Sequence, residues 1–262
     1  MDLGLAGKVA LVCGASTGIG FAVADELGAN GATLVICARD RQRLEAARAR
    51  LAPTTGNVLV VPGDLSTTEG VHAVTTQALA TYGGVDVLVT NTGGPKPGPA
   101  DTHDWAAWEA AVALLLKSVV ELTRAVLPGM RERRWGRVVA ITSMAVKQPV
   151  DNLVLSNSVR AAVTGYCRTL ANEVAAHGVT VNTVLPGYTN TDRLGDLARA
   201  TSERSGKPIT EIQSQWTREI PAARIGEPPE IAAVVAFLAS ARASYVTGQS
   251  IAVDGGWIKS LL

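Results

Sequence analysis

Short runs of apolar residues, rich in Val, Leu and Ile, alternate along this chain with segments that have the periodicity of helices. The runs cover residues 9–13, 33–37, 58–61, 85–90, 138–142, 180–185 and 250–253, and the helical segments cover 19–29, 42–51, 67–81, 105–133, 159–176 and 230–238. Strands that are apolar on both faces are typical of a parallel sheet buried between two layers of helices. The pattern therefore predicts an α/β fold with a doubly wound parallel sheet.

The length and composition fit a single soluble domain. A chain of 262 residues, 47% of them apolar, can bury one substantial core, so we expect one domain over residues 1–262. The net charge is +1 and no basic stripe is present, so we expect no nucleic-acid partner. No segment approaches the roughly 20 uninterrupted apolar residues of a membrane span, and residues 1–8 lack a secretory layout. These features predict a cytoplasmic protein without a membrane partner.

The cysteine and histidine content gives no sign of a metal centre. Cys13, Cys37 and Cys167 are widely spaced, and the first two lie in apolar runs, so we expect buried, reduced thiols. No cluster of His, Cys and carboxylate residues has the spacing of metal ligands, so we expect no metal site.

One long stretch, residues 188–224, lacks a clear apolar pattern and contains Gly and Pro among polar residues. Open α/β sheets bind ligands beyond the carboxyl ends of their strands, and functional loops cluster there. We expect this stretch to be an irregular lid over such a site. An ordinary surface excursion is the alternative.

A glycine-rich turn follows the first apolar run and opens the first helical segment. Residues 14–20 read Gly-Ala-Ser-Thr-Gly-Ile-Gly. A turn this tight needs residues without a Cβ, and the amino terminus of the next helix presents free N–H groups that can bind a pyrophosphate. The spacing, Gly-x3-Gly-x-Gly, differs from the common dinucleotide pattern Gly-x-Gly-x-x-Gly, and a plain strand-helix turn is the alternative.

This spacing and several later motifs resemble the short-chain dehydrogenase/reductase family over essentially the whole chain. The matches are Asp64-Leu65 after the third strand, residues 86–93 (Asp-Val-Leu-Val-Thr-Asn-Thr-Gly), Pro186-Gly187 after the sixth strand, and residues 245–249 and 253–256. Cys13 and Thr90 stand where the family usually has Thr and Asn. The resemblance, which is to enzymes of the 3-oxoacyl-acyl-carrier-protein reductase type, implies a Rossmann fold that binds a nicotinamide cofactor.

The same resemblance implies which residues bind the cofactor. They come from the glycine turn and from the ends of the later strands. The set is Gly14, Ser16, Thr17, Gly18, Ile19, Gly20, Arg39, Asp64, Leu65, Asn91, Gly93, Arg160, Pro186, Gly187 and Thr189.

The end of the second strand indicates which nicotinamide cofactor is bound. An acidic side chain there would bind the ribose 2′-hydroxyl of NAD(H) and repel the 2′-phosphate of NADP(H), whereas an arginine can bind that phosphate. The acidic position is Ala38, and Arg39 follows it, so we expect NADP(H) rather than NAD(H). Asp40 offsets part of this charge, and a solvated residue at a helix start is the alternative role for Arg39.

The catalytic residues that the resemblance implies are mostly replaced in this chain. The family reduces carbonyl groups with a serine, a Tyr-x-x-x-Lys pair and a helix asparagine, in which the lysine lowers the pKa of the tyrosine. Ser143 matches the serine. Ser156 stands at the tyrosine position, Arg160 at the lysine position and Leu115 at the asparagine position.

These replacements change what the site can do. A serine is roughly 4 Å shorter than a tyrosine and a far weaker acid, so Ser156 needs a bridging water to reach the same point. Arg160 cannot pass on a proton as an ammonium can, but its guanidinium can bind ribose hydroxyls or stabilise an anion. We expect reduction to be slowed by roughly 10²–10⁴-fold rather than abolished.

Two other side chains could supply the proton. Tyr188, just past Pro186-Gly187, is expected near the nicotinamide, and Lys147 follows Ser143 by about one turn. Pocket lining is the alternative role for Tyr188, and solvent exposure is the alternative for Lys147. The candidate catalytic residues are therefore Ser143, Ser156, Arg160 and Tyr188.

Three functions remain open on this sequence. The first is an NADP(H)-dependent oxidoreductase that acts on a carbonyl or alcohol group of a small-molecule substrate with a divergent proton donor. The second is a nucleotide-binding pseudoenzyme or sensor without redox turnover. The third is a non-redox dehydratase or isomerase on the same fold.

The long helical segment predicts self-association. Residues 113–127 are apolar around much of the helix, more than one sheet contact requires. Relatives in the family pair such helices between subunits, and their carboxyl-terminal segments join a second interface. We expect a homo-oligomer, a tetramer or a dimer, and a helix buried within the monomer is the alternative.

Overall fold

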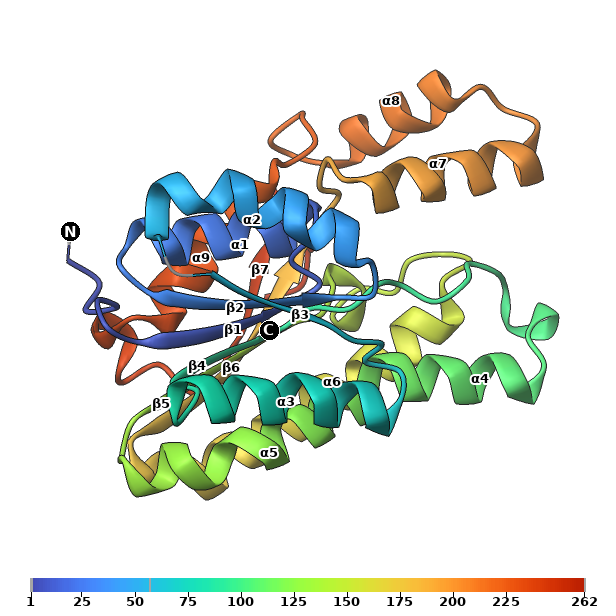
Figure 1. The fold of residues 1–262 in the computed structure, drawn as a ribbon. Helices are drawn as coiled ribbons and strands as arrows, with labels where there is room; N and C mark the ends of the chain where they lie inside the picture. Colours follow the sequence, from blue (N-terminus) through green and yellow to red (C-terminus); the bar gives the residue numbers. More distant parts are fainter. Residues whose placement is uncertain (1, 57, 262) are drawn as a thin grey trace.

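Seven parallel strands form the centre of the protein in a computed structural model that describes residues 2–56 and 58–261 (Figure 1). The strands are β1 (Val9–Cys13), β2 (Thr33–Ala38), β3 (Val58–Pro62), β4 (Val87–Thr90), β5 (Gly136–Ile141), β6 (Val179–Pro186) and β7 (Ser250–Val253). Their order is β3-β2-β1-β4-β5-β6-β7, and every neighbouring pair is parallel. The strand order reverses between β1 and β4, which is where open α/β sheets bind ligands. The predicted doubly wound parallel sheet is confirmed.

Helices cover both faces of this sheet. In Figure 1, α1 (Gly18–Ala29), α2 (Arg41–Thr55) and α9 (Pro228–Ala239) lie above the strands, and α3 (Thr68–Tyr82), α5 (Ser118–Glu132) and α6 (Val154–Val174) lie below them. Successive strand residues point to opposite faces, so Leu11 is buried in one apolar core and Val12 in the other. This burial on both sides explains why the strands are apolar throughout.

The helix predicted over residues 105–133 is interrupted. It consists of α4 (Trp105–Val112), a π-helical turn over Ala113–Lys117, and α5. The wider turn carries Leu115, which is buried at 2% exposure. The helix predicted over 159–176 starts earlier, at Val154, so Ser156 lies in its first turn.

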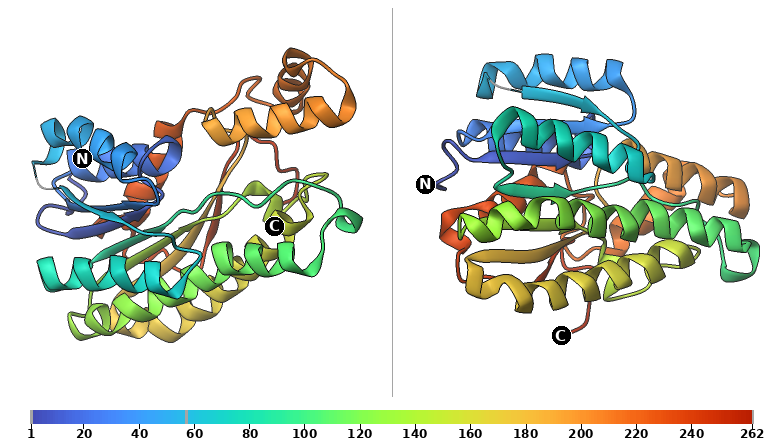
Figure 2. Two further views of the ribbon diagram at one scale, coloured as in Figure 1. Left: turned by 45° about the vertical axis from the view of Figure 1, so that its right-hand side comes forward. Right: turned by 60° about the horizontal axis from the view of Figure 1, so that its bottom comes forward.

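The prediction of an irregular stretch at 188–224 is wrong, because most of it is helical. The stretch contains α7 (Asp192–Ser205) and α8 (Ile209–Glu219), which project with α4 beyond the same end of the sheet (Figure 2). Both helices are mostly polar, and each has a narrow apolar stripe: Leu194, Leu197 and Ala198 on α7, and Ile212 and Trp216 on α8. The apolar residues recur at helical spacing in both helices, but they are few and the rest of the stretch is polar.

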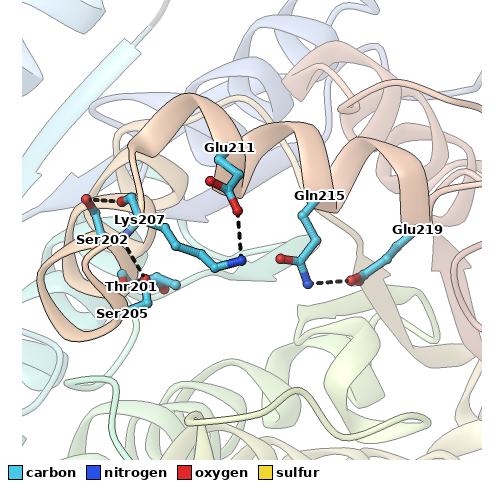
Figure 3. Close-up of polar contacts among 7 residues, drawn as sticks. All are labelled: Thr201, Ser202, Ser205, Lys207, Glu211, Gln215 and Glu219. Atoms are coloured by element: carbon cyan, nitrogen blue, oxygen red, sulfur yellow. Dashed lines mark hydrogen bonds and ion pairs between the residues drawn. The ribbon is translucent and has the colours of Figure 1, made fainter.

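Polar side chains hold the turn between α7 and α8 (Figure 3). The hydroxyl of Ser202 donates to the carbonyl of Lys207 over 2.7 Å, and the Lys207 ammonium pairs with Glu211 at 2.7 Å. Further along α8, Gln215 donates to Glu219 over 3.2 Å. These contacts lie on the exposed side of the helix pair, and the apolar stripes face the body of the protein.

The three cysteines lie in the core of the protein. Cys13, Cys37 and Cys167 are all buried and unpaired by disulfides, as the sequence predicts. Burial raises the pKa of Cys167 to about 12, and the pKa of Cys13 is also raised, first by its contact with Cys37. Over residues 2–56 and 58–261, no helix has both the length and the apolar character needed to cross a bilayer.

Candidate active site

The glycine turn folds as a tight cradle between β1 and α1. Gly14 and Gly18 have positive φ values of 60° and 58°, in the left-handed region that glycine adopts freely. A Cβ on Gly20 would lie 2.2 Å from the carbonyl oxygen of Gly14, so the first turn of α1 packs directly on the turn that precedes it. Thr17 is the N-cap of α1 and its side chain caps no N–H group. The free N–H groups at this helix start fit the pyrophosphate of a dinucleotide.

The ends of β2 and β3 carry the residues expected around the adenosine half of the cofactor. Ala38 ends β2, and Arg39 is exposed beside it. The Asp40 carboxylate accepts from the backbone N–H of Arg43 over 3.0 Å at the start of α2, so it is engaged in capping that helix. The pKa of Asp64 is lowered, first by hydrogen bonds from Ser66 and then by the charge of Arg39.

A cavity of about 310 Å³ joins the glycine turn to the candidate catalytic residues, a size typical of a small-molecule site. Thirteen residues named from the sequence share its lining: Gly14, Thr17, Gly18, Ile19, Asn91, Gly93, Ser143, Ser156, Arg160, Pro186, Gly187, Tyr188 and Thr189. Ser16, Gly20, Arg39, Asp64 and Leu65 lie outside that lining, and the Leu65 side chain belongs to the core at 7% exposure. Any contact of Leu65 with a cofactor would be through its main chain.

Ser143 follows β5 and faces the cavity. Its backbone is extended, and its hydroxyl oxygen accepts from the N–H of Ala145 over 3.1 Å. That contact orients the hydroxyl and leaves its proton available for an acceptor in the cavity. Lys147 is exposed and does not line the cavity, which fits its alternative role as a solvated residue.

Arg160 lies one helical turn after Ser156 on α6, so both side chains share one face of the helix. One guanidinium nitrogen of Arg160 donates to the carbonyl of Ile141 over 3.1 Å, and another donates to the carbonyl of Gly93 over 3.4 Å. Burial, and then the charge of Arg193, lower the pKa of Arg160 to about 10. At neutral pH the group is therefore still a cation, held between the ends of β4 and β5.

Leu115, which the resemblance assigns to the family's asparagine position, is surrounded by apolar side chains. Leu115 packs in a cluster with Leu155 and Val159 of α6. An alkyl side chain there offers neither a donor nor an acceptor for a water chain.

Tyr188 is held in an aromatic cluster at the base of the lid. Its ring stacks on Trp216 at a centroid distance of 4.9 Å and meets Trp257 edge-on at 6.1 Å. Burial, and then the carboxylates of Glu219 and Asp151, raise the pKa of the phenol above its usual value. A phenol that holds its proton this tightly is a weaker acid than a free tyrosine, so the geometry favours the alternative role, pocket lining.

The cavity also contains residues that sequence reasoning missed. Thr191, Asp192 and Arg193 line it from the start of α7. Arg193 reaches across the cavity to donate to the carbonyl of Pro95 over 2.7 Å. A Thr-Asp pair is a common helix start, and this signal could have placed α7 and hence Arg193. In residues 2–56 and 58–261, no group of three metal-ligating side chains is arranged to hold an ion.

Comparison with known proteins identifies the family of this chain. Residues 14–258 match the family described as enoyl-(acyl carrier protein) reductase. The chain is 34% identical to the 3-oxoacyl-[acyl-carrier-protein] reductase FabG of Vibrio cholerae, over 97% of this chain and 98% of that one.

Solved structures give the same result. The L-sorbose reductase of Gluconobacter frateurii, solved with NADPH and L-sorbose, superposes with a TM-score of 0.94 at 34% identity over the full length of both chains. The actinorhodin polyketide ketoreductase, solved with NADPH, gives a TM-score of 0.92 at 32% identity, over 97% of this chain and 98% of that one. By sequence and by fold, the chain belongs to the short-chain dehydrogenase/reductase family, whose members named here are oxidoreductases acting on carbonyl or alcohol groups.

Proposed function

We propose that this protein is an NADP(H)-dependent reductase that converts a carbonyl group of a small molecule to an alcohol with a divergent proton donor. The observation that carries the proposal is the single cavity that joins the glycine cradle to Ser143 and Arg160. The relatives solved with NADPH and the position of Arg39 support NADP(H) rather than NAD(H).

The retained residues can stabilise the charge that develops during reduction. A reduced nicotinamide bound beside Ser143 and Arg160 would supply the hydride for the carbonyl carbon, which would leave negative charge on the carbonyl oxygen. The Ser143 hydroxyl donates a hydrogen bond to that oxygen, and the fixed cation of Arg160 stabilises the alkoxide. Water in the cavity, held by Ser156, gives the alkoxide its proton and regains one from bulk solvent.

The first test separates this proposal from its rivals. Purified protein would be titrated with NADPH and NADH by fluorescence, and cofactor absorbance would then be followed with a panel of ketones and aldehydes. Tight NADPH binding with turnover is expected. Binding without turnover would favour a pseudoenzyme or a non-redox activity. The replacements at positions 156 and 115 are what make these alternatives worth testing. Absence of NADPH binding would contradict the proposal.

Arg39→Ser is expected to weaken NADPH binding and to leave NADH binding nearly unchanged. Loss of a charged hydrogen bond to the 2′-phosphate removes about 1.5–3 kcal/mol, which is roughly 10- to 150-fold in Kd. Arg48→Ser is the control, because Arg48 is exposed on α2 and pairs with Glu45 at 3.0 Å. Equal losses for the two cofactors would show that Arg39 does not select between them.

Tyr188→Phe is expected to change kcat by less than about threefold, because a phenol with a raised pKa contributes little as an acid. The ring contacts with the two tryptophans are kept in this variant. Steady-state rates with the best ketone of the panel would measure the effect. A fall of about 100-fold or more, the size of a lost general acid, would return the proton-donor role to Tyr188.

The protein is expected to be a dimer or tetramer. Apolar side chains are exposed on α4, at Trp105 (72%) and Val112 (40%), and near the carboxyl terminus at Leu261 (101%). Such residues gather at association surfaces. Size-exclusion chromatography with light scattering at micromolar concentration would give the mass, and a monomer of 27.2 kDa would contradict the expectation.

A further inference from the structure

Arg193 lies in the first turn of α7, where its charge does not help the helix. The amino terminus of a helix favours anions, so a cation there opposes the dipole. The side chain is half-buried and lines the same cavity as Ser143 and Arg160. An anion outside the helix would offset this unfavourable position of the Arg193 cation.

Two guanidinium groups donate to main-chain carbonyls of the segment that follows β4. Arg193 donates to the carbonyl of Pro95 over 2.7 Å, and Arg160 donates to the carbonyl of Gly93 over 3.4 Å. The Arg193 group lies so close to Gly94 that a Cβ there would be 2.7 Å from its Nε atom. Gly94 thus gives the guanidinium room to approach the main chain. The two cations are brought together at the mouth of the catalytic region.

No acid in the described parts of the chain forms an ion pair with either of these two arginines. Asp196, on the same helix as Arg193, is exposed and forms an ion pair with Arg199. Asp192 also lines the cavity, but it is exposed. The charged lining is therefore two arginines against one aspartate. Burial lowers the pKa of both arginines, the charge of Arg193 further lowers that of Arg160, and the charge of Asp196 offsets only part of the lowering at Arg193.

We propose that Arg193, with the charge of Arg160 nearby, binds a carboxylate on the substrate, so that the substrate of the proposed reductase is an oxo acid. Among the described residues, Arg193 is seen to donate only through one N–H of Nη2, so the second N–H of Nη2 and an N–H of a neighbouring nitrogen can form the two parallel bonds that a carboxylate accepts. With the carboxylate bound at Arg193, Ser143 in the same cavity can donate to the oxo group of the substrate.

The rest of the cavity limits what the acid can carry. Its lining includes the apolar side chains of Met144, Val150, Leu153, Leu194 and Leu197. These residues suit an alkyl chain and exclude a second charged group. The expected substrate is thus a monocarboxylic oxo acid with an apolar tail. This inference rests on the proposed function for the reaction, but the binding of the carboxylate can be tested separately.

The test compares an acid with its neutral counterpart. The probes are 2-oxohexanoate and 3-oxohexanoate and their methyl esters, which keep the carbon skeleton and remove the charge. Binding to the wild-type protein would be measured by calorimetry, with and without NADP⁺, so that turnover is not needed. Where turnover occurs, kcat/KM would be compared for each acid and its ester. At least one acid is expected to bind about 10- to 100-fold more tightly than its ester, the range for a charged hydrogen-bonded pair.

The variant that tests the residue is Arg193→Gln, with Arg199→Gln as a matched control on the exposed side of the same helix. Arg193→Gln should remove the preference for the acid and leave ester binding and NADPH affinity unchanged, whereas Arg199→Gln should change none of these. Arg193→Lys, which keeps the charge but not the planar fork, should recover part of the preference.

Three results would overturn the inference. They are equal binding of acids and esters to the wild-type protein, an unchanged acid preference in Arg193→Gln, or a loss of NADPH affinity in that variant, which would assign Arg193 to the cofactor phosphates. Failure of the wild-type protein to bind NADPH would contradict the proposed function instead, and the acid-ester comparison would still decide this inference.

Discussion

Gly20→Ala is expected to abolish NADPH binding and to destabilise the fold. The new Cβ would lie 2.2 Å from the carbonyl oxygen of Gly14 and 2.8 Å from the side-chain nitrogen of Asn91. Neither group can move away cheaply, because Gly14 is held in a left-handed turn and both belong to the cradle itself. Overpacking of this kind destabilises a protein by about 1–3 kcal/mol. A displaced cradle also misdirects the N–H groups that the pyrophosphate needs, so we expect at least roughly 100-fold weaker binding.

Thermal unfolding and fluorescence titration with NADPH would measure the two effects. Gly165→Ala is the matched control, because Gly165 is exposed within α6 and a Cβ there meets no atom within 4 Å. That control should bind NADPH normally and gain about 0.5–1 kcal/mol of stability from the better helix former. Normal NADPH affinity in Gly20→Ala would show that the cofactor does not use this turn.

The sheet could be predicted because each strand carries its own signal. β1 and β2 are apolar along their whole length, and the residues after them, the glycine turn and Arg39, mark where the strands end. The burial of both strand faces leaves few other arrangements for such segments. Ser143, just after β5, and Thr189, just after β6, were instead named from the resemblance to the family.

The helices of residues 188–224 were harder to predict than the sheet, because only the helix-start signal at Thr191-Asp192 and a few apolar residues mark them. In α7 the apolar stripe includes Leu194 and Leu197, and the turn after it at Gly206 and Pro208 resembles loop punctuation. Arg193 was missed for this reason, since a residue in an irregular loop has no defined direction. Its approach to Pro95 depends on a contact between segments far apart in the chain, which no local pattern encodes.

The break in the helix over 105–133 has a related cause. The residues of the π-helical turn, Ala113–Lys117, are ordinary helix formers, so nothing in their types indicates a wider turn. Leu115 was assigned to the family's asparagine position from the resemblance alone, and its packing with Leu155 and Val159 of α6 comes only from the fold. That packing strengthens the case for a proton path that does not use the family's asparagine position.

The second large effect is expected at the residues that hold the carbonyl oxygen. Ser143→Ala and Arg160→Gln should each lower kcat by about 100- to 1,000-fold, the usual loss for one donor that stabilises an oxyanion. Arg160→Gln should also weaken NADPH binding, because Arg160 stands where the family binds the nicotinamide ribose, whereas Ser143→Ala should not. Lys147→Ala is the control, because Lys147 is exposed and outside the cavity, and its rate should match that of the wild type.

The pH dependence gives Arg160 a signature that a structural role would not produce. The active form is the cationic guanidinium, whose pKa is lowered to about 10, so the cation is lost as pH rises through that value. The wild-type kcat should therefore be level across neutral pH and fall above about pH 10, and this fall should be absent from the residual activity of Arg160→Gln. A tyrosine-lysine pair with a depressed phenol pKa would instead put an ionisation near neutral pH. A wild-type profile with a clear inflection near neutrality would mean that a titrating acid, and not water beside a fixed cation, supplies the proton.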